Sequence, residues 1–207
     1  FLDELPEFKR EVLEAMRQPL EDGVVTISRV NASITYPCSM MLVASMNPCK
    51  CGYYGDSTHR CSCTPAQIDA YRSKISGPLL DRIDIQTEVG AVDYSSLSKQ
   101  SGGERSKDIK KRVNAARARQ EERYKGLSIH SNSQLGAAEL EKFCKIGETE
   151  HRLLKNAFDR LGLSARAYSR ILKVARTIAD LAGSENINAV HIAEAIQYRS
   201  LDRKYVE

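Results

Sequence analysis

The sequence lacks a long apolar run. Nowhere in its 207 residues do about 18 apolar residues follow one another, so we expect no membrane-spanning helix and no membrane partner. The first residues also lack the basic, apolar and small-residue segments of a secretory signal peptide. Without such a signal, six cysteines indicate metal binding or burial rather than a disulfide scaffold. We therefore expect a cytoplasmic protein.

The sequence also lacks a dominant charge and a phosphate-binding loop. Its 31 Lys and Arg residues nearly balance 27 Asp and Glu residues, and the net charge of +4 permits DNA contact without requiring it. The pattern Gly-x-x-x-x-Gly-Lys-Ser/Thr occurs nowhere, and Gly102-Gly103-Glu-Arg-Ser-Lys107 does not fit it. The loop that usually holds the phosphates of a nucleotide is thus missing.

The first eight residues carry an acidic pair. Phe1 and Leu2 run into Asp3-Glu4, after which Pro6 turns the chain, as at the end of a buried strand. Ligands bind at such strand ends in open α/β sheets. One carboxylate can hold the Mg²⁺ of a nucleoside triphosphate while its neighbour polarises the attacking water, although an ordinary strand-to-helix turn has the same pattern. Because Phe1 begins inside this predicted strand, we expect the chain to be a fragment of a longer polypeptide.

Two types of apolar spacing follow the acidic pair. Residues 9–20 have the spacing of a helix, whereas residues 24–37 alternate with the period of two that strands show. The second pattern predicts a β-hairpin that turns near residues 31–33. Its tip is either a contact point for a partner or a plain solvated loop.

Residues 40–46 form an apolar run that predicts a strand buried on both faces. The run ends at Asn47-Pro48. The Asn47 amide offers both a donor and an acceptor to a water or a phosphate. An Asn before Pro is equally typical of a turn, so both interpretations stay open.

Four of the six cysteines form two close pairs. The pairs are Cys49-Lys-Cys51 and Cys61-Ser-Cys63. If the loop between them folds back, it offers four thiolates to a structural Zn²⁺, with His59 as a substitute ligand. Reduced cysteines in a mobile loop are the rival interpretation, and a redox site is a third. Cys38 and Cys144 stand alone and are predicted to be packing residues.

The segment 77–85, Gly-Pro-Leu-Leu-Asp-Arg-Ile-Asp-Ile, predicts an apolar turn that leads into a strand through Val89. Arg82 lies at this junction. It is either a structural partner of Asp81 or Asp84, or an arginine finger whose planar fork suits a γ-phosphate.

The second half of the sequence is helical in pattern. Polar residues 93–105 predict a linker. Helices are then expected at residues 106–124, 137–144, 149–161, 164–181 and 188–198. The first of these carries Lys110, Lys111, Arg112, Arg117, Arg119 and Arg123, which form either a solvated face or a nucleic-acid contact. Ser164 and Asn188 are expected to cap the last two helices.

Four stretches, in this order, resemble one family. They read Phe-Leu-Asp-Glu-Leu-Pro-Glu-Phe at 1–8, Ser-Met-Asn-Pro-Cys at 45–49, Gly-Pro-Leu-Leu-Asp-Arg-Ile-Asp at 77–84 and Ser-Ala-Arg-Ala-Tyr-Ser-Arg at 164–170. Together they resemble the magnesium-chelatase-like AAA+ ATPases of the ComM/YifB family. The resemblance implies an α/β part followed by an all-α part. Residues 1–92 would be the C-terminal part of an AAA+ core, an incomplete parallel sheet with a hairpin insert, and residues 93–105 a linker before a helical lid domain at 106–207.

The resemblance also implies roles for individual residues. Asp3 would bind Mg²⁺ and Glu4 would activate water, as the Walker B pair. Asn47 would be sensor 1, and Arg82 would be the arginine finger that reaches the ATP of a neighbouring subunit. Arg166 would be sensor 2.

Arg170 lies one helical turn after Arg166 and is the alternative sensor 2. The family has a Gly-rich Walker A loop and an amino-terminal domain upstream of the acidic strand, and this sequence contains neither. We therefore expect negligible ATPase activity from this chain alone, and the cofactors of the longer protein to be ATP and Mg²⁺.

The family resemblance implies ATP-driven work on DNA by a hexameric branch-migration helicase in natural transformation, with the hairpin facing the central pore. A motor subunit that drives metal insertion into a porphyrin is the alternative, since it uses the same ATPase parts. The cysteine loop resembles that of the ComM-like proteins rather than that of the chelatases, and this resemblance favours the DNA interpretation. A non-catalytic helical binding module is a second alternative, but it gives no reason for Asp3-Glu4, Asn47 and Arg82.

Overall fold

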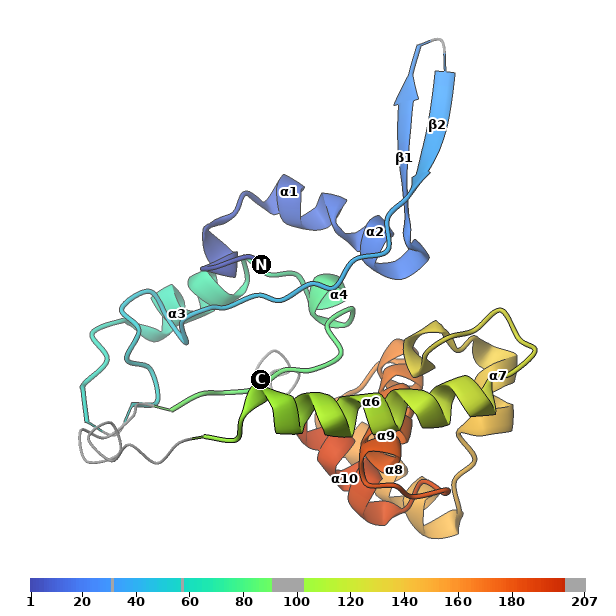
Figure 1. Ribbon diagram of the computed structural model, residues 1–207. Helices are drawn as coiled ribbons and strands as arrows, with labels where there is room; N and C mark the ends of the chain where they lie inside the picture. Colours follow the sequence, from blue (N-terminus) through green and yellow to red (C-terminus); the bar gives the residue numbers. More distant parts are fainter. Residues whose placement is uncertain (31, 57, 91–102, 200–207) are drawn as a thin grey trace. The chain divides into compact units, whose positions relative to one another are not determined.

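A computed structural model describes residues 1–30, 32–56, 58–90 and 103–199. The chain divides into two compact units, Phe1–Ile83 and Asp84–Glu207 (Figure 1). Most of the predicted linker at 93–105, the predicted turn residue Asn31 and the last residues of the predicted lid domain, 200–207, lie outside the described residues. No helix in the described ranges is long and apolar enough to cross a membrane.

The first unit combines short helices with one hairpin. Its elements are the 3-10 helix η1 (Leu5–Glu7), α1 (Arg10–Ala15), α2 (Arg17–Asp22), β1 (Val24–Arg29), β2 (Ala32–Pro37), α3 (Pro65–Arg72) and α4 (Gly77–Leu80). The helix predicted at 9–20 is thus two helices that meet at Met16. The core of the first unit includes Leu5, Leu13, Ile68, Tyr71, Ile75, Leu79 and Leu80.

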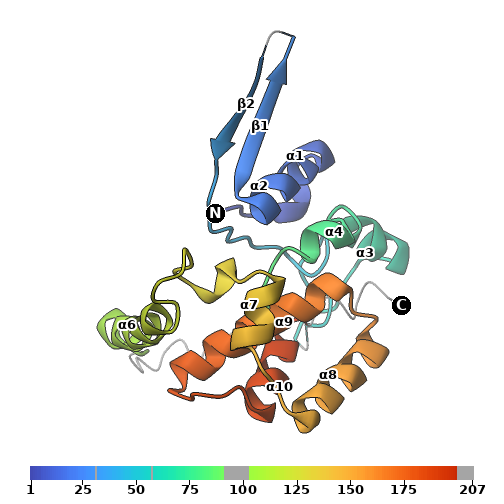
Figure 2. The same cartoon turned by 90° about the vertical axis from the view of Figure 1, so that its right-hand side faces the viewer.

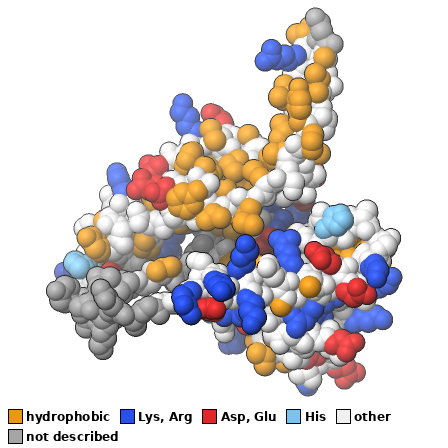
Figure 3. Space-filling view, viewed as in Figure 1, with side chains coloured by type: hydrophobic (Ala, Val, Ile, Leu, Met, Phe, Trp, Pro, Cys, Tyr) orange, Lys and Arg blue, Asp and Glu red, His pale blue; other side chains and the backbone are white. Residues whose placement is uncertain are grey.

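The predicted hairpin is confirmed. β1 and β2 pair antiparallel, with Val24 opposite Pro37 and Arg29 opposite Ala32. Two cross-strand hydroxyl pairs add to the ladder, and in one of them the Thr26 and Thr35 oxygens lie 3.0 Å apart. Hydrophobic side chains line the exposed hairpin, as Figure 3 shows.

The parallel sheet is reduced to a single bridge in this unit's described residues. Leu2 pairs with Ala44, with the Leu2 N–H donating to the Val43 carbonyl at 2.9 Å. The prediction of a strand at 40–46 buried on both faces is wrong, because Met41 is 86% and Val43 50% exposed. An apolar run is covered on both faces only where further elements pack on it, and Leu2 is its one described ladder partner.

The strand predicted through Ile85 and Val89 is also wrong. Ile85 is 56% and Val89 87% exposed, and Gln86 forms an isolated bridge to Arg199. Gln86 is buried and its neighbours are exposed. This segment therefore contributes one buried polar residue rather than a strand in a sheet. The structure therefore confirms mixed helix with a small two-stranded sheet, and of the predicted incomplete parallel sheet the described residues form only isolated bridges.

The second unit is helical. Its elements are α6 (Ser106–Arg123), the 3-10 helix η2 (Asn132–Gln134), α7 (Ala137–Phe143), α8 (Glu148–Leu161), α9 (Ala165–Leu181) and α10 (Ala189–Gln197). The predicted caps are confirmed, since the Ser164 hydroxyl accepts from the Ala167 N–H and the Asn188 side chain accepts from the Val190 N–H. Gly162 caps the C-terminal end of α8, and its φ of 59° suits glycine.

The core of the second unit forms around α9, which packs against α6, α7 and α10 (Figure 2). Cys144 is buried in this core, as predicted, whereas Cys38 is half-buried. Three apolar side chains of these helices are exposed: Ile109, Val113 and Val190.

Charged groups also enter this core. Asp180 is fully buried and binds the guanidinium groups of Arg123 and Arg176, of which Arg176 is itself buried. The Asn132 amide donates to Asp180 at 2.9 Å, and the Tyr124 hydroxyl donates to the Asn132 oxygen at 2.6 Å. Buried charges of this kind are tolerated only when paired and hydrogen-bonded.

Candidate active site and thiol cluster

The acidic pair and the segment before Asn47 are joined by hydrogen bonds. The Ser45 hydroxyl donates to the Asp3 carboxylate, and the Leu5 N–H donates to the Ser45 carbonyl at 2.8 Å. Ser45 thus fixes both Asp3 and the turn that follows it. Ser45 was not predicted as a site residue, although its position two residues before Asn47 places both on one side of an extended segment.

Glu4 has an unusual backbone conformation. Its φ of 51° and ψ of 52° make it the one non-glycine residue with positive φ among the described residues. Its N–H lies 3.2 Å from Asp3 Oδ1 and 3.4 Å from Ser45 Oγ. Such a conformation costs on the order of 1–3 kcal/mol and is concentrated at active sites and ligand clamps. Glu4 and Asp3 are both exposed, so their carboxylates are open to ligands.

Asn47 lies between two fixed points. Before it, Ser45 holds Asp3; after it, the Pro48 carbonyl accepts from Arg72 Nε of α3 at 3.2 Å, and Cys49 is completely buried. The Asn47 side chain itself is exposed. The structure therefore brings Asp3, Glu4 and the Asn47 segment together at one end of the Leu2–Ala44 bridge.

Arg82 is held inside the first unit. It forms an ion pair with Glu21 of α2, and its Nη1 donates to the Pro78 carbonyl at 2.7 Å. Its side chain is only 7% exposed. Glu21 is distant from Arg82 in sequence, so this partner could not be identified from the local pattern, which pointed to Asp81 or Asp84.

The two sensor 2 candidates differ in their surroundings within the second unit. Arg166 lies exposed in the first turn of α9. Arg170, one turn further, forms an ion pair with Asp84, and its side chain is 20% exposed. Arg166 is therefore the more accessible of the two.

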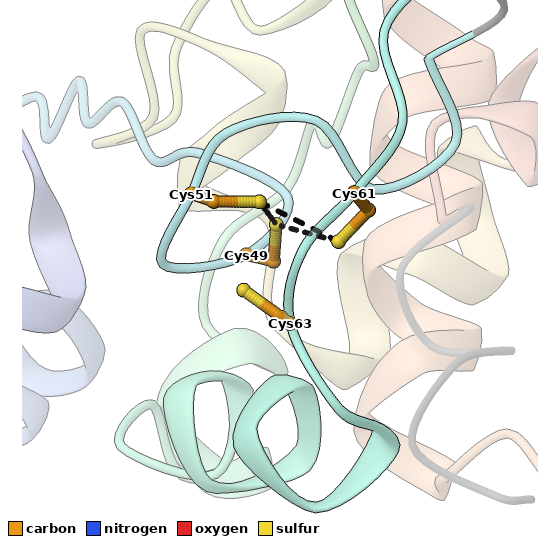
Figure 4. A group of neighbouring side chains, drawn as sticks. All are labelled: Cys49, Cys51, Cys61 and Cys63. Carbon is orange, nitrogen blue, oxygen red and sulfur yellow. Dashed lines mark hydrogen bonds between the residues drawn. The ribbon is translucent and has the colours of Figure 1, made fainter.

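The four paired cysteines form one cluster, whose side chains point toward one another in Figure 4. The Sγ atoms of Cys49 and Cys51 are 3.4 Å apart, those of Cys49 and Cys61 3.7 Å, and those of Cys51 and Cys61 3.5 Å. All four sulfurs lie within 4.8 Å of one another. His59 is not part of the cluster: its ring stacks on Tyr53 instead.

Ionisation within the cluster is uneven. The backbone N–H groups of Tyr53 and Ser62 donate to the Cys51 sulfur and lower its pKa to about 5. The N–H of Cys63 favours the Cys61 thiolate, but burial and the neighbouring thiols outweigh it and raise the pKa of Cys61 to about 12. Thiolates this close repel one another, so ionisation of one disfavours that of the next.

The donor atoms divide into two chemical types. The acidic end offers the carboxylate and hydroxyl oxygens of Asp3, Glu4 and Ser45, hard donors that suit Mg²⁺. The thiol cluster offers soft sulfur donors, which suit zinc. The residues present therefore fit both metals, at separate places.

Comparison with known proteins gives the class of this chain. Residues 1–97 match the family described as magnesium chelatase, subunit ChlI, and residues 103–199 match the family of the ChlI C-terminal region. Over 204 residues, 98% of the chain, it is 45% identical to the uncharacterized protein YifB of Salmonella typhimurium and 46% identical to the competence protein ComM of Haemophilus influenzae. An uncharacterized protein of Mycobacterium tuberculosis is 33% identical over 199 residues, 96% of the chain.

The chain covers 39% of the length of each of these relatives. It belongs to the magnesium-chelatase-like family of YifB and ComM, as the resemblance of its motifs predicted.

Proposed function

We propose that this chain supplies the hydrolysis residues of an AAA+ ATPase. The observation that carries the proposal is the joining of Asp3, Glu4 and Ser45 at the end of the Leu2–Ala44 bridge, with Glu4 in a strained conformation that this hydrogen-bonding holds. An ordinary turn has no need for a glutamate in the left-handed region, where glycine or asparagine costs less.

Each residue has a distinct task in this proposal. Asp3 would hold Mg²⁺, which when bound would neutralise charge at the phosphates. The Glu4 carboxylate accepts a proton from the attacking water, and the Asn47 amide orients that water. Ser45 keeps the Asp3 carboxylate in one rotamer by donating to it. The phosphate-binding loop would come from the longer protein, because this sequence has none.

Two arginines complete the proposed site in an assembled ring. Arg82 acts as the finger on the ATP of a neighbouring subunit, and this requires the Glu21 pair to open. Arg166, which is exposed, serves as sensor 2, with Arg170 as the alternative if its pair with Asp84 opens. The domains in this proposal are those predicted: core at 1–92, linker at 93–105 and lid at 106–207.

The work done with ATP is proposed to be on DNA, in a hexameric ring in the cytoplasm. The name of one relative, competence protein, points to DNA uptake, and this chain offers basic residues on α6 (Figure 3). Arg112, Arg119 and Arg123 of that helix engage Glu104 or Asp180, and Lys110, Lys111 and Arg117 are further exposed basic residues of the same helix. The exposed hairpin is the proposed pore element.

A chelatase-type motor is the second candidate function. The family described as magnesium chelatase, subunit ChlI, supports it, since that description covers both matched regions. The two candidates share their ATPase residues and differ in what stimulates turnover. DNA stimulates the first, whereas a metal-inserting partner stimulates the second.

The test uses the chain extended to the full length of its relatives, with ATPase measured with and without forked DNA. Glu4→Gln should lower kcat by about 10²–10⁴-fold, because it removes the proton acceptor. Glu11→Gln, an exposed carboxylate on α1, is the matched control and should leave kcat unchanged. Full activity in Glu4→Gln would disprove the assignment, and an absence of DNA stimulation would favour the chelatase-type motor.

The same assay tests the finger and the fragment interpretation. Arg82→Ala should abolish most turnover in the assembled protein, and its full retention would remove Arg82 from the site. The 207-residue chain alone should show negligible ATPase. Robust turnover by that chain, once purified to homogeneity, would show that the missing loop is not needed.

A further inference from the structure

The thiol cluster, defined as Cys49, Cys51, Cys61 and Cys63, is built from two turns that face each other. In the first turn the Gly52 N–H donates to the Cys49 carbonyl at 3.0 Å, and the φ of Gly52, 86°, lets the chain reverse there. This reversal brings the Cys51 sulfur back beside that of Cys49. Although only one residue separates Cys49 from Cys51, both sulfurs can therefore bind the same ion.

Contacts among its own side chains also close the loop between the turns. The Asp56 carboxylate accepts from the Thr58 N–H at 2.6 Å, the Thr58 hydroxyl at 2.7 Å and the His59 N–H at 3.0 Å. Tyr53 stacks on His59 with ring centroids 4.8 Å apart. These contacts return the chain to Cys61 and so hold the second turn opposite the first.

Helix α3 fixes the outer ends of both turns. Thr64 follows Cys63 and caps α3 through a reciprocal pair of hydrogen bonds with Gln67. Arg72, at the end of α3, donates to the Pro48 carbonyl beside Cys49 and lies over the Tyr54 ring at 4.6 Å. Both ends of the cluster are thus anchored to the same helix.

The sulfur separations identify what the cluster is built to hold. A disulfide requires about 2.05 Å between sulfurs, whereas Cys49 and Cys51 Sγ are 3.4 Å apart. Four sulfurs around a tetrahedral zinc with Zn–S of about 2.3 Å lie about 3.8 Å apart. The separations among the Cys49, Cys51 and Cys61 sulfurs, 3.4, 3.7 and 3.5 Å, are close to that value, and the Cys63 sulfur lies within 4.8 Å of all three. The backbone N–H groups of Tyr53 and Ser62 also donate to the Cys51 sulfur, an outer contact of the kind that orients a metal ligand.

We propose that Cys49, Cys51, Cys61 and Cys63 bind one structural Zn²⁺, and that this ion fixes the segment carrying Asn47. Cys49 is completely buried and lies two residues after Asn47, while Ser45 holds the segment two residues before it. The metal is thus the second of two anchors around Asn47. Zinc binding does not depend on the proposed ATPase function, and only the consequence for Asn47 rests on that function.

The first measurement is the metal content of the 207-residue chain, purified without added zinc. We expect about one zinc per chain, and four thiols that react with a thiol reagent only when zinc is released. Replacement by Co²⁺ should give the visible absorption bands of tetrahedral thiolate coordination. A chain with no metal and four reactive thiols would overturn the proposal, as would stoichiometric iron or a disulfide. Because this measurement uses the unmodified chain, misfolding of a variant cannot obscure it.

The second measurement uses substitutions. Cys61→Ser should weaken zinc binding by at least about 10- to 100-fold, the loss that outer-shell changes alone cause. Cys38→Ser is the matched control, since Cys38 lies outside the cluster, and should retain full zinc content. Hydrogen exchange of the backbone amides at residues 45–49 should speed up when zinc is removed from the unmodified chain. If the chain binds and releases zinc but hydrogen exchange at residues 45–49 does not change, the anchoring of Asn47 is refuted and zinc binding is not.

Discussion

At the scale of single residues, Asp180 is the central charged group of the second unit. Its carboxylate is fully buried, and burial alone would raise its pKa. Hydrogen bonds from Arg123 and Asn132 and the charge of Arg176 outweigh burial, so the pKa of Asp180 lies below its usual value. The ionised carboxylate therefore stabilises the fold by neutralising two guanidinium groups.

Asp180→Asn should lower the free energy of unfolding by about 3–5 kcal/mol, because it leaves Arg123 and Arg176 without their counter-ion. Urea unfolding followed by circular dichroism measures the change. Asp159→Asn, an exposed carboxylate on α8, is the matched control and should cost little. A loss below about 1 kcal/mol in Asp180→Asn would show that the pair contributes no more than a surface salt bridge.

The same residue predicts a pH dependence. Since the pKa of Asp180 is lowered in the folded chain, its stabilisation is complete above the unfolded-state pKa of about 3.9 and is lost as pH falls through the lower folded-state pKa. Unfolding free energies measured from neutral pH downward should therefore fall more steeply below about pH 4 in the unmodified chain than in Asp180→Asn. Parallel curves for the two proteins would contradict this prediction.

At the scale of elements, the helix ends of the second unit could be predicted from sequence and its buried charges could not. Ser164, Asn188 and Gly162 act on neighbouring backbone groups, so the local pattern suffices. Arg176 and Asp180, by contrast, have the helical spacing of solvated residues, and only their partners on other segments make them core residues. Long-range pairing decides their burial.

The first unit shows the same limit for strands and for the candidate site. The apolar pattern of residues 40–46 predicted a buried strand, but burial depends on elements that pack on it, and Met41 is exposed. Asp3 and Asn47 were predicted as site residues from their motifs. Ser45 and Glu21 were not, because their roles come from contacts with residues distant in sequence.

The cap of α9 gives a prediction at this scale. Ser164→Ala removes the acceptor of the Ala167 N–H and should cost about 1 kcal/mol of unfolding free energy. Ser169→Ala, within the same helix, is the control and should be neutral or slightly stabilising, since alanine favours helix interiors. Equal effects of the two substitutions in urea unfolding would show that the cap contributes nothing.

The ion pair between Glu21 of α2 and Arg82 gives a second prediction at the scale of elements. Glu21→Gln removes an ion pair with a partly exposed carboxylate, worth about 0.5–1 kcal/mol, and should make Arg82 roughly two- to fivefold more reactive toward an arginine-modifying reagent. Peptide mass spectrometry measures the rate at Arg82, with Glu11→Gln as the control. Because Glu21 lies just before β1, an increase would mean that the hairpin base restrains the proposed finger. An unchanged rate would show that the Pro78 carbonyl and the surrounding packing are sufficient.

At the scale of the whole molecule, the two units differ in how their cores are built. The large hydrophobic cluster that includes Tyr124, Leu154, Ile171 and Ile192 lies entirely within residues 84–207. The first unit consists of short helices and a hairpin and has a smaller core. The thiol cluster belongs to this unit. Burial of apolar area is the main source of stability, so the second unit should be stable without the first.

We therefore expect residues 84–207, expressed alone, to unfold cooperatively, and residues 1–83 to do so only with zinc bound. Leu154→Ala should cost about 2–5 kcal/mol both in the 84–207 fragment and in the whole chain, because the side chains that pack around Leu154 are the same in each. A chelator should lower the melting temperature of the 1–83 fragment and leave that of the 84–207 fragment unchanged. The 84–207 fragment thus also serves as the control for chelator effects unrelated to the cysteines. If the 84–207 fragment shows no cooperative transition, or Leu154→Ala costs much less in it than in the whole chain, then the helical core depends on the first unit.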